Sequence, residues 1–137
     1  MDSSVKLNKK NFIKKRGEKM QGNVDIKRGT TPTLPITIFM PFENVKHIDF
    51  IFKKQIDDKA PKLLEMGFDF PDNENLIHKE NNSFVIDVEF EEEQTRKLVG
   101  GEIYMDTRIV LTNNKIPPTE IVPLDIGKTL YGEAYNK

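Results

Sequence analysis

The sequence predicts an all-β domain, a β-sandwich with one short helical turn around residues 91–99. Four segments carry apolar side chains at every second position, with polar residues between them: 48–52, 84–90, 103–111 and 122–126. A period of two is typical of strands that place one face on a core and the other in water. Short strands that recur with turn residues between them indicate a sandwich of antiparallel strands.

The first elements follow a turn at residues 28–32, where Gly29 permits unusual backbone angles and Pro32 fixes φ before a strand. A strand is predicted over 33–39. Pro35 cannot donate to a ladder, which indicates either an edge strand or the beginning of a strand. The next strand is predicted over 45–54.

The middle of the chain is the least regular part. Residues 62–66 are compatible with a helical turn or with a short strand, and both stay open. Residues 69–75 have the composition of a loop, and a turn is expected at 81–82, before the strand that begins at Phe84.

The last third begins with residues 91–99, which favour helix, and Gly100 and Gly101 are expected to end it. After the 103–111 strand, residues 113–114 predict a tight hairpin turn. The final strand is predicted over 119–126, and Pro123 again favours an edge.

Size and composition exclude several classes of protein. A chain of 137 residues is long enough for one domain with an adequate core. It has no cysteine, which excludes a disulfide framework, thiol catalysis and cysteine-ligated metals. No apolar stretch approaches the roughly 20 residues that span a bilayer, so no membrane association is expected.

Charge divides the chain into two parts. Residues 1–19 carry seven basic and two acidic side chains, a net charge of +5, whereas the remainder carries −6. We expect residues 1–22 to be a basic flexible leader and residues 23–137 to be a single β-sandwich domain. Nucleic acid is expected as a partner only through residues 1–19, because the acidic body would repel phosphate.

No constellation for catalysis or metal binding stands out. His47 and His78 are the only histidines, and neither belongs to a known ligand motif. Asp69, Asp72 and Glu74 share one loop but lack the ligand spacing of an EF-hand, so a solvated acidic loop is expected. We therefore predict no enzyme, no cofactor and no bound metal.

One strand face carries a mixed set of polar side chains. Tyr104, Asp106 and Arg108 lie at every second position and therefore point the same way. An acid beside a base at this spacing is more often a cross-strand charge pair on the wet face of a sheet than a catalytic site.

Five sequence segments are informative when they are taken together and in order. They are the turn and strand at 28–38, the strand at 48–55, the strand at 84–90 followed by EEQT at 92–95, TRI at 107–109 and IVPLDIGKTL at 121–130. Taken in this order, residues 26–133 resemble a family of small virion proteins of tailed bacteriophages and prophages of low-GC Gram-positive bacteria.

The resemblance implies an immunoglobulin-like sandwich that serves in a tail, baseplate or other virion part, similar to the N-terminal domain of baseplate upper proteins. It implies other virion proteins as partners, in a homo-oligomer or multi-protein assembly, and synthesis in the host bacterial cytoplasm. It carries no catalytic residues. The candidate assembly contacts are Arg28, Thr30, Tyr104, Arg108, Pro117 and Tyr131.

An alternative function is a carbohydrate-binding β-sandwich module. Such modules usually expose aromatic rings for stacking on sugars. The chain has no tryptophan, and most of its phenylalanines fall on core-facing positions, which counts against this alternative. Tyr104 and Tyr131 are the residues that would carry it.

Overall fold

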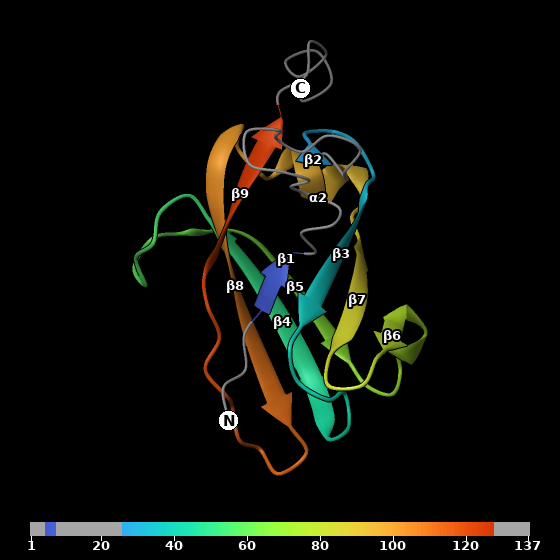
Figure 1. The fold of residues 1–137 in the computed structure, drawn as a ribbon. Helices are drawn as coiled ribbons and strands as arrows, with labels where there is room; N and C mark the ends of the chain where they lie inside the picture. Colours follow the sequence, from blue (N-terminus) through green and yellow to red (C-terminus); the bar gives the residue numbers. More distant parts are fainter. Residues whose placement is uncertain (1–4, 8–25, 128–137) are drawn as a thin grey trace, which may run out of the picture.

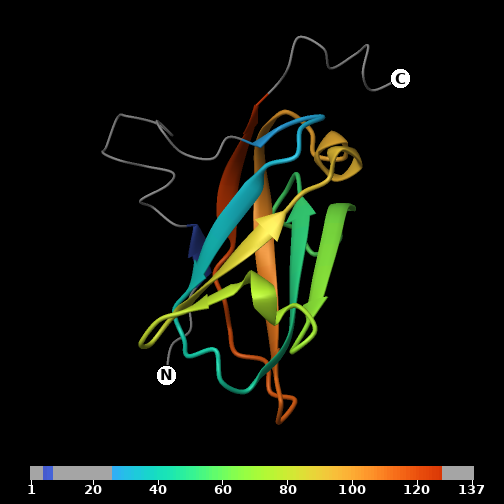
Figure 2. The ribbon, with the colours of Figure 1, turned by 90° about the vertical axis from the view of Figure 1, so that its right-hand side faces the viewer.

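A computed structural model describes residues 5–7 and 26–127 of the chain. These residues form two sheets that stack face to face, which confirms the all-β, sandwich-like prediction (Figures 1 and 2). The four-stranded sheet has the order β1 (Val5–Leu7), β3 (Thr33–Ile38), β7 (Phe84–Glu89) and β6 (Ile77–Lys79). The five-stranded sheet has the order β2 (Ile26–Lys27), β9 (Val122–Gly127), β8 (Gly101–Leu111), β4 (Val45–Lys53) and β5 (Lys62–Asp69).

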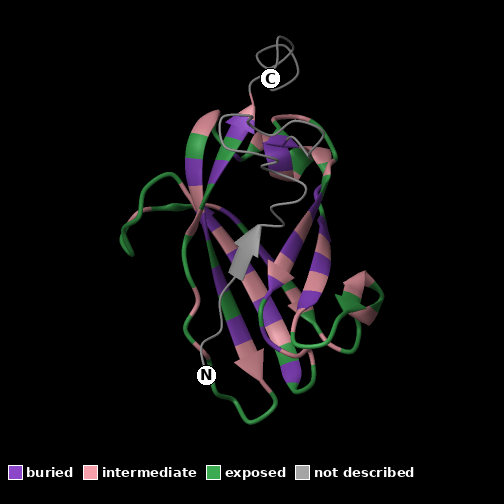
Figure 3. Cartoon of the chain, viewed as in Figure 1, coloured by how far each residue is buried: buried purple, intermediate pink, exposed green. Residues whose placement is uncertain are grey.

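The core lies between the two sheets and is filled by alternate residues of their strands, as Figure 3 shows along β3, β4 and β8. Phe50 and Ile86, from opposite sheets, are completely buried. The rings of Phe52 and Phe90 meet edge to face across the two layers, 5.9 Å apart. The alternating pattern in the sequence therefore identified the buried faces correctly.

The short helix predicted within residues 91–99 is present as α2 (Glu92–Arg96). The backbone N–H of Glu91 donates to Oε1 of Gln94 over 2.7 Å, which satisfies one of the free donors at the helix start. Gly101 has φ of +97°, a conformation that favours glycine, and there the chain turns from the helix into β8. A second helical piece, the 3₁₀ turn η1 (Glu74–Leu76), lies in the predicted 69–75 loop region.

The structure corrects the prediction of a purely antiparallel fold. β2 pairs with β9 in parallel, Ile26 opposite Ile126, whereas the other ladders of the described residues are antiparallel. β2 is the outermost strand on that side of the five-stranded sheet, and it runs in the same direction as β9. Residues 62–66, left open between helix and strand, belong to β5.

The edge positions predicted from proline were wrong for both strands. β3 lies between β1 and β7, and β9 lies between β2 and β8. The outer ladders are short, however. β1 covers residues 36–38 and stops beside Pro35, and β2 covers residues 126–127, three positions beyond Pro123. Neither proline therefore faces an outer strand. The missing N–H of each proline removes no hydrogen bond from the two outer ladders.

The final strand is shorter than predicted and begins at Val122, so residues 119–121 form a connection. A turn is present at 113–114, where the Asn114 N–H donates to the carbonyl of Leu111 over 2.7 Å. The prediction of a tight hairpin was wrong, because residues 112–121 separate β8 from β9 and the ladder of these two strands begins only at Met105 opposite Val122. Residues 5–7 of the predicted leader form β1, which pairs with β3. The rest of 1–22 lies outside the described residues, and the domain boundary stays a prediction.

Candidate interaction surface

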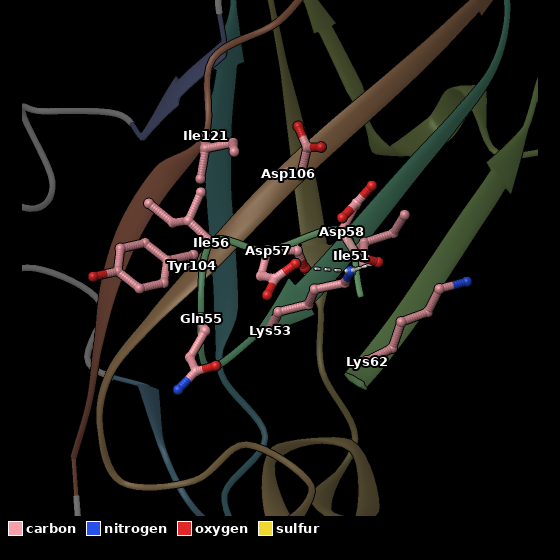
Figure 4. A pocket seen from close by; sticks show the side chains of 10 residues that line it. All are labelled: Ile51, Lys53, Gln55, Ile56, Asp57, Asp58, Lys62, Tyr104, Asp106 and Ile121. Atoms are coloured by element: carbon pink, nitrogen blue, oxygen red, sulfur yellow. Dashed lines mark hydrogen bonds between the residues drawn. The ribbon is translucent and has the colours of Figure 1, made fainter. Parts of the chain in front are cut away.

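The outer face of the five-stranded sheet carries a surface hollow of about 280 Å³. Its floor comes from neighbouring positions of β4 and β8, and one wall comes from residues 55–58, which follow β4. Figure 4 shows Tyr104, Ile56 and Ile121 together at one end of the hollow and Lys62 at the other.

Strand register places the floor residues side by side. Lys53 is opposite Tyr104, and Ile51 is opposite Asp106, in the antiparallel ladder of β4 and β8. Their neighbours Phe52 and Met105 point into the core. The same alternation that builds the core therefore turns these four side chains outward.

Lys53 holds the wall of the hollow in place. Its Nζ donates to the backbone carbonyls of Asp57 and Asp58, each over 3.1 Å. Oδ1 of Asp57 accepts the N–H of Lys59 over 2.9 Å, which closes a local turn. The 55–58 segment is thus tied back to the sheet by a side chain from the preceding strand.

The hollow exposes several apolar side chains. Ile56 is 62% exposed and Ile121 is 42% exposed, and the half-buried Ile51 and Tyr104 also line the hollow. A single exposed isoleucine is ordinary, but apolar side chains gathered in one concave place are typical of a contact surface.

Carboxylates outnumber available cations around the hollow. Asp57, Asp58 and Asp106 line it, and none of them forms an ion pair within the part of the chain that the structure describes. The ammonium of Lys62 is engaged by Glu65 over 3.0 Å. The hollow therefore combines exposed apolar side chains with carboxylates that an incoming cation could pair.

Tyr104 has a polar partner beside the hollow. Its hydroxyl donates to Oε1 of Glu102 over 3.1 Å. This hydrogen bond raises the pKa of the Tyr104 hydroxyl, so the ring stays neutral and keeps its donor at physiological pH.

A second cluster lies farther along the same sheet face, centred on His47. Nδ1 of His47 lies 2.6 Å from Oδ1 of Asp69, and Nε2 lies 2.6 Å from Oδ1 of Asp49. Oδ2 of Asp49 lies 3.6 Å from the guanidinium of Arg108 on β8. The predicted cross-strand pair of acid and base is thus present, with Asp49 as the acid in place of Asp106.

Both ring nitrogens of His47 face carboxylates, an arrangement that suits the doubly protonated imidazolium. Partial burial acts to lower the pKa of His47, but the hydrogen bonds and charges of Asp49 and Asp69 outweigh it and raise the pKa above the ordinary 6.5. Gly67 gives the cluster its space, because a Cβ there would stand 2.8 Å from Oδ1 of Asp49.

Two predicted contacts, Arg28 and Thr30, lie in a turn that is bonded to α2. The guanidinium of Arg28 donates to the carbonyl of Arg96 over 3.0 Å. The N–H of Thr30 donates to Oγ1 of Thr95 over 3.0 Å, and Oγ1 donates to the Thr30 carbonyl over 2.8 Å. These contacts give both residues a role within the fold, and their role in assembly stays a prediction.

The other four predicted contacts are dispersed. Tyr104 lines the hollow and Arg108 lies on the same sheet face, four positions along β8. Pro117 is half-buried in the connection between β8 and β9. Tyr131 lies outside the described residues. The structure therefore brings together Tyr104 and Arg108 on one face and places Arg28 and Thr30 at another part of the molecule.

Of the ten residues that line the hollow, only Tyr104 and Asp106 were singled out from the sequence. Ile56 falls between two predicted strands, Ile121 falls within the strand predicted over 119–126, and Asp58 belongs to an ordinary charged run. The available signal was the isolated Ile56 within the otherwise polar residues 53–59, since an apolar side chain there has no periodic reason to be buried.

The histidines and the acidic loop form no recognisable metal site. Nε2 of His78 pairs with Asp87 over 2.7 Å, away from His47. Asp69 is engaged by His47, while Asp72 is exposed and Glu74 pairs with Lys79 over 3.0 Å. Within residues 5–7 and 26–127 no three side chains are placed to share a metal ion.

The comparisons with known proteins add no identification: neither the protein-family models nor the curated proteins gave a match to this chain. Among the described residues, no helix combines the length and the apolar character needed to cross a membrane. The lining of the hollow suits a side chain or a small group that makes apolar contact and pairs with charge.

Proposed function

We propose that this protein is a structural component of a tailed-phage virion, an adaptor-type module of the tail or baseplate that works by protein–protein assembly. The observation that carries the proposal is the hollow in which Ile56 and Ile121 remain exposed beside Tyr104. Exposed apolar area in a concave, polar-rimmed site gains most when another protein covers it.

The proposal includes an immunoglobulin-like sandwich. In immunoglobulin domains one sheet has the strand order A-B-E-D and the other contains C, F and G, with C′ added in the variable type. The orders β1-β3-β7-β6 and β5-β4-β8-β9 follow the same scheme when the strands are lettered in chain order, with β2 as a further piece beside β9. Phe50 is a fully buried aromatic residue on β4, the strand that takes the letter C, and antibody domains carry a buried tryptophan on that strand.

Assembly in this proposal takes place among copies of the chain and other virion proteins, after synthesis in the cytoplasm of the bacterial host. Binding, and not catalysis, is the activity. The hollow supports this proposal because it offers exposed apolar side chains beside carboxylates for contact with another protein.

Mass spectrometry of purified tailed particles from the encoding strain tests the proposal. We expect the chain among the particle proteins, and we expect Ile56→Ser to lower its incorporation strongly. Ile116→Ser is the matched control, because Ile116 is 47% exposed but does not line the hollow. Absence of the wild-type chain from particles, or equal incorporation of Ile56→Ser and wild type, would overturn the proposal.

One observation favours a second candidate, carbohydrate binding. The Tyr104 ring lies in the hollow together with Gln55 and three carboxylates, and an aromatic face beside polar side chains is a common sugar-binding arrangement. Glycan-array binding that is lost in Tyr104→Ala would support this candidate. Failure of the wild-type protein to bind any glycan would remove it.

A further inference from the structure

We propose that the hollow receives residues 9–16 of a second copy of this chain. Residues 9–16 are called the arm, and the contact joins the arm of one copy to the sheet of the next. The inference rests on the proposed function and names the partner of the same surface. Residues 9–16 lie outside the described part of the chain, and their sequence is KKNFIKKR.

Charge is the first reason for this occupant. Asp57, Asp58 and Asp106 present carboxylates without an ion-pair partner among the described residues. Residues 9–16 carry five basic side chains and no acidic one. The hollow also holds Lys53, which bonds the backbone carbonyls of Asp57 and Asp58, and Lys62, which pairs with Glu65. A segment with the composition of residues 9–16 could pair with the three carboxylates, and attraction between a +5 arm and a −6 body also favours encounter of two copies.

Apolar contact is the second reason. Phe12 and Ile13 are the only adjacent apolar residues in the basic arm, and they stand between its two groups of basic residues. The hollow offers partners for both kinds of side chain, with Ile56, Ile121 and Tyr104 gathered at one end and the three carboxylates between them and Lys62 (Figure 4). A side chain in the hollow would cover apolar surface while its neighbours pair with the carboxylates.

The source of the arm is a second copy in this proposal, and docking within one copy is the competing arrangement that the test distinguishes. Residues 8–25 join β1 of the four-stranded sheet to β2 of the sheet that carries the hollow. In a contact between copies, the arm of one copy and the hollow of the other are two different patches. Contacts between unlike patches are heterologous and build rings or chains of subunits.

Light scattering of the full-length chain and two variants tests the inference. The hollow variant is Ile56→Ser with Asp58→Lys, and the arm variant is Phe12→Ser with Ile13→Ser. We expect wild type to form a discrete oligomer and each variant alone to stay at the monomer mass of 15.8 kDa. An equimolar mixture should recover a species of twice that mass, because one intact arm and one intact hollow remain.

Controls separate folding from docking. Circular dichroism should show an unchanged β-spectrum for every variant, and Ile116→Ser should assemble as wild type. A variant that fails to fold is replaced by the milder Ile56→Thr or Asp58→Asn, for which a reduced share of oligomer is expected and an unchanged share would count against the contact.

Several outcomes would overturn the inference: a monomeric wild type at all soluble concentrations, variants that keep the oligomer, or a mixture that stays monomeric. Docking of the arm within its own copy would appear as a monomeric wild type. A chain that is monomeric in solution but present in particles refutes the arm contact and leaves the virion function standing. If the wild type forms an oligomer and the mixture of variants recovers the dimer, but the chain is absent from particles, the arm contact stands and the virion function is refuted.

Discussion

Replacing Thr95 with valine is expected to weaken the link between α2 and the turn at residues 28–30 without changing the shape of the core. Thr95 is completely buried. Its Oγ1 accepts the N–H groups of Gly29 over 2.9 Å and of Thr30 over 3.0 Å, and donates to the Thr30 carbonyl over 2.8 Å. Valine has nearly the same volume but cannot make any of these three bonds.

The size of the effect follows from the three bonds. Each intramolecular hydrogen bond contributes roughly 0.5–1.5 kcal/mol net, and a donor left buried without a partner costs more. Gly29 is half-buried and Thr30 is exposed, so water can reach part of the freed backbone. We therefore expect Thr95→Val to lower the free energy of unfolding by about 2–3 kcal/mol.

Thr95→Ser is the matched control, since it keeps the hydroxyl and removes one buried methyl group. It should cost about 1 kcal/mol. Urea unfolding followed by circular dichroism measures both, and amide hydrogen exchange reports directly on Gly29 and Thr30. The reasoning is refuted if Thr95→Val is as stable as Thr95→Ser, or if the two amides remain as protected in the valine variant as in wild type.

Two further predictions concern the cluster around His47. Because the folded-state pKa of His47 is raised above 6.5, its charged form stabilises the fold fully below that pH, and this contribution disappears as the pH rises through the raised pKa. Urea unfolding at a series of pH values should therefore show a loss of stability over this range in wild type that is absent in His47→Gln, and parallel curves would contradict the assignment. Gly67→Ala should displace the Asp49 carboxylate, which a new Cβ would approach to 2.8 Å. An NMR titration should then show the pKa of His47 moving back toward its ordinary value, and an unchanged pKa would count against the role of Gly67.

The pattern of the fold was largely predictable because burial along a strand repeats every two residues. The runs around Phe50, Phe84 and Ile103 carry that period without interruption, and all three residues are fully buried. The segment 62–66 was not predictable, since its leucines and glutamate suit a helix as well as a strand. Pairing with β4, which places Met66 opposite Phe50, decides the outcome through long-range contact.

The surface was only partly predictable, because sequence reveals neighbours along a strand but not across one. Tyr104 and Arg108 share a strand, so their common face followed from spacing alone. His47 and Asp69 are 22 positions apart and meet only through the register of β4 and β5. Ile56 lies at the hollow because Nζ of Lys53 bonds the backbone carbonyls of Asp57 and Asp58. The spacing of apolar residues in the sequence does not predict this bond.

The outer face of the five-stranded sheet has two groups of charged side chains, one with ion-pair partners and one without them among the described residues. In the first, His47 and Arg108 meet the carboxylates of Asp49 and Asp69, so an incoming cation would have to displace an existing partner. In the second, Asp58 and its neighbours in the hollow have no such partner among the described residues, and exposed isoleucine lies beside them. Exposed ion pairs alone contribute little to the free energy of binding. Apolar contact beside a newly formed ion pair buries apolar surface, and the ion pair fixes the orientation of the partner. Recognition on this face is therefore expected at the hollow, which is why Ile56 and Asp58 are changed together in the hollow variant.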